Sequence, residues 1–204
     1  MWNKTEKQGG PDYPGVRGRL GHTVMPHHRI SENHALREFF RSLVHDSLAV
    51  TTGLNDRDVE EYLSGLITEF MHADASALVV GDEAIEDLTK MVVAGDVRLG
   101  ADSFDRARVV HKHIGDYVMF WSGIFPEQTE RMRRRGEAAG LVNPVRLGKA
   151  SYHLVSTFVH GDYAQEAPLF KRLSNGFETY LFALHLVREA WETDGREWSE
   201  GFRS

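Results

Sequence analysis

Two histidines and an aspartate lie close together in HKHIGDYVMFWSGIFPE, residues 111–127. Imidazole and carboxylate side chains bind metal ions and transfer protons, so this stretch could form a metal site or a catalytic site. His111 and His113 are two positions apart, which places them about 200° apart on a helix, so they cannot chelate one ion together. His113 and Asp116 are three apart and share a face. They are the candidate catalytic pair, and the alternative is an ion pair that only orients the histidine.

Eleven histidines in a chain without cysteine also suggest a metal site. The dipeptide His45-Asp46 resembles that of the HD-type metal phosphohydrolases, which are all-helical, and the resemblance is confined to this pair. We favour no cofactor. The alternative hypothesis is a hydrolase or metal-binding protein that holds a divalent transition metal through His45, Asp46 and His72, with His22 or His28 as further ligands.

Aromatic residues offer a third kind of site. Tyr117, Trp121, Phe158 and Tyr180 could line an apolar pocket for a small ligand between three predicted helices. The sequence predicts this pocket only as an alternative, because aromatic residues at helical spacing more often belong to a core.

The sequence RMRRR contains a cluster of basic residues in which Arg131, Arg134 and Arg135 share one helical face. Such a face could bind phosphates. The chain carries a formal net charge of −6, however, which makes nucleic acid an unlikely partner and favours solvent or an acidic protein surface.

Helices must position all these residues. Apolar residues recur at i, i+3, i+4 and i+7, with N-caps, prolines and glycines at plausible boundaries. The first predicted helix begins after Ser31, the second after Asn55 or Asp56, and the third runs from Asp82 to Gly95. A fourth runs from Ser103 into residues 111–127, and a short fifth helix begins at Pro126. The last two run from Asn143-Pro144 to Gly161 and from Pro168 towards the C-terminus. The fold class is therefore all-α, an irregular bundle of six or seven helices.

Composition limits the organisation of the chain. The 204 residues fit one domain, and 41% hydrophobic residues are enough for a core. We expect a flexible N-terminal arm at 1–30, rich in glycine and proline, a helical domain at 31–193 and a C-terminal tail at 194–204. No signal peptide or apolar run of about 20 residues is visible. With no cysteine, the expectation is a cytoplasmic protein that does not enter a membrane.

The stretch GDYVMFWSGIFPE, together with LREFFRSLV and YLSGLITEF, resembles an uncharacterised group of bacterial proteins of about this length. The resemblance implies a bacterial, cytoplasmic, helical protein. It brings no catalytic residues, because no activity is established for the group.

The strong patterns are packing stripes, and no complete catalytic set accompanies them. The leading hypothesis is therefore a non-enzymatic domain that binds another protein or a second copy of itself. Aromatic residues in both tails, Trp2 and Trp198, suit an interface.

Overall fold

The computed structural model describes the chain in several ranges: residues 35–53, 55–73, 104–127, 130–131, 134 and 143–201. Within these ranges the helices are α1 (Ala35–Thr52), α2 (Arg57–Ala73), α4 (Phe104–Ile124), α6 (Pro144–Val155), α7 (Ala167–Asn175) and α8 (Phe177–Gly201), with a 3-10 helix η1 (Gly161–Gln165) before α7. No strand occurs in the described ranges, so the predicted all-α class is confirmed. The predicted arm at 1–30 and the predicted helix at 82–95 lie outside them.

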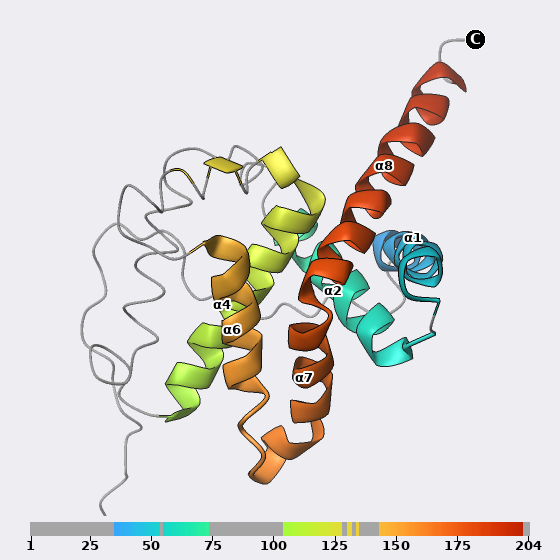
Figure 1. Ribbon diagram of the computed structural model, residues 1–204. Helices are drawn as coiled ribbons and strands as arrows, with labels where there is room; N and C mark the ends of the chain where they lie inside the picture. Colours follow the sequence, from blue (N-terminus) through green and yellow to red (C-terminus); the bar gives the residue numbers. More distant parts are fainter. Residues whose placement is uncertain are drawn as a thin grey trace, which may run out of the picture.

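Helix α8 runs between two groups of helices (Figure 1). It packs against α1 on one side and against α4 on the other, while α1 also contacts α2, and α4 lies along α6. The rings of Phe40 on α1 and Trp191 on α8 meet edge to face with their centroids 5.7 Å apart. The core is therefore shared by helices from both ends of the described chain.

The first two helices form as their apolar spacing predicts. Phe40, Val44 and Leu48 recur at intervals of four and are buried, as is the matching stripe of α2. Between the helices, the side chain of Asp56 accepts a hydrogen bond from the backbone N–H of Val59 at 3.2 Å, which identifies Asp56 as the residue that caps α2.

The central helix α4 is buried on every side in its second half. All residues from Ile114 to Ile124 are buried, although the sequence predicted only a stripe there. The reason is that α4 is enclosed by α2, α6 and α8. Within the described ranges, no helix is both long enough and apolar enough to cross a membrane.

Helix α6 begins as predicted and ends earlier. The Asn143 side chain accepts a hydrogen bond from the N–H of Val145, and Pro144 follows as the first helical residue. The predicted end at Gly161 is corrected to Val155. There the Ser156 hydroxyl donates to the carbonyl of His153, and the Thr157 hydroxyl donates to that of Leu154, so the side chains take up carbonyls that would continue the helix.

The predicted final helix from Pro168 is two helices. The break lies at Gly176, whose backbone has φ −96° and ψ 17°, outside the helical region. A side chain at this position would overlap the ring of Tyr180, which lies 2.8 Å from where a Cβ would stand. Helix α8 then continues to Gly201, so its backbone extends beyond the predicted domain boundary at 193.

Glycines bring α4 and α6 into close contact. A Cβ on Gly115 of α4 would overlap the Tyr152 ring of α6, and a Cβ on Gly148 of α6 would stand 2.8 Å from Cβ of Val118 on α4. Each helix therefore provides a glycine where the other inserts a side chain. Such a close crossing is a physical reason for a glycine inside a helix, where it otherwise lowers stability.

Replacing Gly115 with alanine is expected to lower the free energy of unfolding by about 1–3 kcal/mol, because a methyl group must displace the Tyr152 ring. Gly65→Ala in α2 is the matched control. A Cβ there would lie 3.7 Å from the Arg37 side chain, an ordinary contact, so the better helix propensity of alanine should stabilise the protein by about 1 kcal/mol. Urea denaturation measures both, and equal effects would contradict the close crossing.

Candidate functional site

A buried carboxylate joins three helices at the centre of the bundle. The Asp116 side chain on α4 accepts hydrogen bonds from the Tyr62 hydroxyl of α2 at 2.5 Å and the Tyr152 hydroxyl of α6 at 2.7 Å, both on Oδ1. Its Oδ2 accepts from Lys112 Nζ, one turn earlier on α4, at 2.7 Å. Asp116 is only 7% exposed, so these three donors replace the water that its charge would otherwise bind.

The two phenols stay protonated in this environment. Burial raises the pKa of Tyr62 and of Tyr152 well above the ordinary value for tyrosine, and the neighbouring Asp116 carboxylate raises it further. The lysine balances the carboxylate and lies against an aromatic surface, with Nζ 5.2 Å from the centre of the Tyr62 ring. The hydrogen bonds of this carboxylate connect α2, α4 and α6. A catalytic role for Asp116 stays a prediction.

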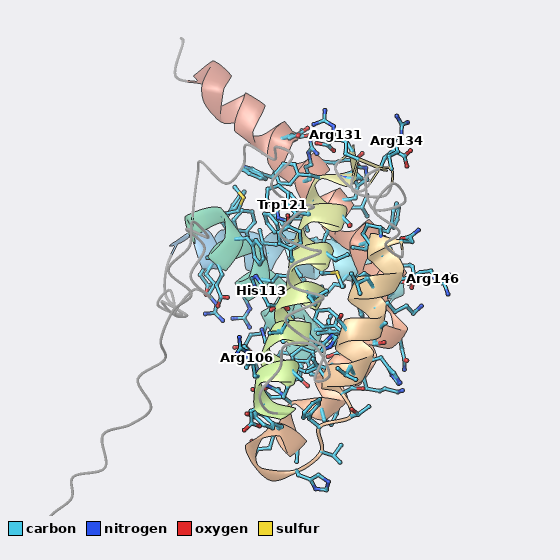
Figure 2. The ribbon with its side chains drawn as sticks, turned by 90° about the vertical axis from the view of Figure 1, so that its left-hand side faces the viewer. Arg106, His113, Trp121, Arg131, Arg134 and Arg146 are labelled. Atoms are coloured by element: carbon cyan, nitrogen blue, oxygen red, sulfur yellow. The ribbon has the colours of Figure 1, made fainter. Side chains whose placement is uncertain are left out.

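The hydrogen bonds described for the Asp116 carboxylate do not include the predicted one with His113. His113 is partly buried on α4, and Figure 2 shows it on a different side of the α4 and α6 pair from Arg146. His111 is directed towards α6, where its Nδ1 lies 3.2 Å from the Ser151 hydroxyl. The two histidines therefore have different surroundings, as their spacing indicates.

A second polar cluster lies between α1 and α2. Glu60, which is 8% exposed, binds His45 Nδ1 at 2.9 Å and Arg41 Nε at 3.2 Å. Burial raises the pKa of Glu60, but the hydrogen bonds from His45 and Arg41 outweigh it and leave the pKa lowered. The same hydrogen bond to Glu60 raises the pKa of His45.

A small cleft adjoins this cluster, with a volume of about 230 Å³. It is smaller than the roughly 300–1,000 Å³ of typical ligand pockets. Its lining is partly polar and consists of His45, Leu48, Ala49, Gly53, Asn55, Asp56 and Glu60.

The structure describes the proposed metal ligands only in part. His45 is engaged with Glu60, Asp46 is exposed beside it, and the described part of the chain contains no group of three or more His, Asp or Glu side chains that could hold a metal. The backbone of His72 belongs to α2, while its side chain lies outside the described parts. A divalent metal at these residues stays a prediction.

The aromatic residues of the predicted pocket occupy different places. Tyr117 and Trp121 are buried neighbours on α4 with ring centroids 6.2 Å apart, and Trp121 also contacts Phe125. Phe158 meets a different ring, that of Tyr163 in η1. The ring of Tyr180 packs against Gly176 at the break between α7 and α8. No described ring contact joins these three groups, and the pocket stays a prediction.

The predicted basic patch is described in part. Arg131 and Arg134 are exposed and lie near each other at one end of the molecule, and Arg134 pairs with Glu130 at 2.8 Å (Figure 2). Arg135 lies outside the described ranges. The arginine that the structure buries is a different one, Arg108 in the first half of α4, which is 5% exposed and pairs with Glu166.

Sequence reasoning missed the partners of Asp116. The spacing of Lys112 and Asp116, four apart on a helix, is a recognisable signal for an ion pair. Tyr62 and Tyr152 carry no such signal, because their spacing fits the apolar stripes of their helices. Comparison with protein-family models, with curated proteins and with solved structures found no match for this chain. The class of the protein therefore rests on its own geometry, a helical bundle around a buried carboxylate.

Replacing Tyr152 with phenylalanine is expected to lower the free energy of unfolding by about 1.5–3 kcal/mol, because a buried charged acceptor loses one donor. Tyr180→Phe is the matched control, since no described hydrogen bond uses its hydroxyl, and its effect should stay within about 0.5 kcal/mol. Denaturant unfolding near neutral pH measures both. Equal losses in the two variants would show that the bond to Asp116 contributes nothing.

The pair of His45 and Glu60 should make stability depend on pH. The raised pKa of His45 gives stabilisation that is complete below its ordinary value of 6.5 and lost as pH rises through the raised pKa. The lowered pKa of Glu60 gives stabilisation that is present above its ordinary value of 4.5 and lost as pH falls through the lowered pKa. The ion pair of His45 and Glu60 is therefore expected to contribute fully to the stability of the protein between about pH 4.5 and 6.5.

His45→Gln tests this dependence. The variant should be less stable than the parent at pH 5.5, and the difference should shrink at pH 8.5, as measured by urea unfolding at both values. His153→Gln, at an exposed position on α6, is the control and should show no such change with pH. A difference for His45→Gln that is the same at both pH values would contradict the ion pair.

Proposed function

We propose that this chain is a non-enzymatic helical domain that acts by binding another protein or a second copy of itself. The observation that carries the proposal is the shape of α8. Its C-terminal part projects beyond the other described helices in both views (Figure 1 and Figure 2). An unsupported helical segment is only marginally stable in water, so contact with a partner would stabilise it.

The polar groups of the interior support the same proposal. Asp116 accepts hydrogen bonds from three donors and Glu60 from two. Most of these bonds connect one helix to another. On the surface, Phe182 of α8 is 57% exposed and Val50 of α1 is 78% exposed. Phe182 lies near the start of α8 and not at its projecting end, so these two exposed side chains are separate from the contact proposed for that end. The lack of cysteine fits a reducing compartment such as the cytoplasm.

Light scattering during size exclusion tests the proposal. We expect a mass above the 23.1 kDa of one chain, or a protein that co-purifies with it from its source. A chain that ends at Thr193 retains Trp191 and the helices of the bundle but lacks the projecting part of α8. This shortened chain should elute as a monomer, should not co-purify with another protein, and should still unfold in one cooperative transition.

Two outcomes would count against this function. One is a strictly monomeric full-length chain with no partner. The other is association that the shortened chain retains in full, which would assign the contact to a surface other than the projecting end of α8.

A further inference from the structure

Arg108 is a buried cation that lies against aromatic rings. It lies in the first half of α4 and is 5% exposed. Its guanidinium carbon stands 4.0 Å from the centre of the Tyr163 ring and 5.8 Å from that of Phe170. Aromatic faces stabilise a cation without providing a hydrogen-bond acceptor. The N–H groups of the guanidinium therefore need acceptors from other parts of the chain or from a ligand.

That requirement is only half met. Arg108 Nη2 donates to the Glu166 carboxylate, and this is the one carboxylate that the described residues bring to it. Nε is buried and has no hydrogen-bond partner among the described residues. Arginine binds a carboxylate or phosphate best through two parallel N–H groups, and Nε with Nη2 forms one such pair. A buried donor without a partner is unfavourable, so an anion that bound both nitrogens would gain a hydrogen bond that Glu166 does not make.

Glu166 is placed so that it can be displaced. It lies in the turn between η1 and α7, and its side chain is 55% exposed although Arg108 is buried. An exposed carboxylate keeps much of its hydration, which limits the cost of its departure from the ion pair. The Glu166 carboxylate stands beside Arg108 where an external oxyanion of similar size would bind. Because the Glu166 side chain is exposed, such an anion could replace it from the solvent.

The neighbourhood favours a negative ligand. Lys112 follows Arg108 by one helical turn, and its Nζ lies 6.0 Å from the centre of the same Phe170 ring. Arg106 is at the same end of α4 (Figure 2), but it is two positions from Arg108 and so lies on another side of the helix. Asp116 offsets the charge of Lys112, so Arg108 is the buried cation that a negative ligand would meet here.

We propose that Arg108 is the centre of a binding site for a small molecule that carries a carboxylate or phosphate group. Glu166 occupies the site from within the chain, and the ligand replaces it on Nη2 and adds a bond to Nε. The site is separate from the projecting end of α8, so it goes beyond the protein-binding role proposed above and can fail or succeed independently of it.

Calorimetric titration with inorganic phosphate and with acetate, at constant ionic strength and in chloride, tests the site. The parent protein should bind one of the two saturably at one site. Glu166→Ala should bind the same anion about tenfold more tightly if Glu166 occupies Arg108 in about nine of ten molecules. Tighter binding of phosphate would indicate a phosphorylated ligand, and tighter binding of acetate would indicate a carboxylate.

Glu178→Ala is the matched control. Glu178 is exposed to a similar degree, pairs with Lys149 at 2.8 Å, and its loss changes the net charge by the same amount. It should leave anion affinity unchanged. In the Glu166→Ala background, Arg108→Lys keeps the charge but lacks the paired N–H groups, and should weaken binding at least tenfold.

Several results would overturn the proposal. They are the lack of saturable binding of either anion to the Glu166→Ala variant, equal tightening in Glu178→Ala, and unchanged affinity when Arg108 becomes lysine. If Glu166→Ala does not fold, Glu166→Gln retains the side-chain volume without its charge. It should still bind the anion more tightly than the parent, and failure to do so would overturn the proposal equally.

Discussion

The hydrogen bond from the Tyr152 hydroxyl to the Asp116 carboxylate fixes how the central helices meet. It forms only because Gly115 has no side chain, which allows the tyrosine ring to lie directly on α4. Gly148 provides the complementary space on α6. A buried charge that lost one of its donors would be strongly unfavourable, so the carboxylate tolerates only one relative position of the two helices.

The same bond connects the crossing to the rest of the bundle. Oδ1 of Asp116 also accepts from Tyr62, so α2 must approach the point where α4 and α6 cross. The rings of Tyr62 and Tyr152 both pack edge to face or tilted against Phe170 of α7, with centroids 5.5 Å apart in each case. Four helices therefore share one polar centre with an aromatic enclosure. Apolar contacts supply most of the stabilisation, while this centre selects the arrangement.

Sequence periodicity predicted the helices well because each of them buries a stripe at helical spacing. Asn143 and Pro144 mark the start of α6 in the structure, as cap and proline chemistry requires. The end of α6 and the break at Gly176 were missed, because hydroxyl groups of Ser156 and Thr157 and the ring of Tyr180 act there through local geometry. The spacing of apolar residues gives no information about such contacts.

Pairings between helices were harder to predict. The sequence singled out Asp116 as the candidate partner of His113, whereas the structure connects Asp116, and Gly115 beside it, to Tyr152. It could not identify that partner, which lies 36 positions away from Asp116. Arg108 escaped notice for the same reason, since Tyr163, Glu166 and Phe170 reach it from a segment more than fifty residues later in the sequence.

The contact of Phe40 with Trp191 has a consequence for how the chain is made. These residues lie in the first and last described helices, so about three quarters of the sequence separates the two rings. During synthesis α1 leaves the ribosome before α8 and can pair with α2, but the part of its apolar stripe that α8 covers stays open until α8 has also left the ribosome. Closing such a long loop is slow relative to local helix pairing. The nascent chain therefore passes through a stage with folded helices and an uncovered surface, and a chaperone would have its longest opportunity to act there.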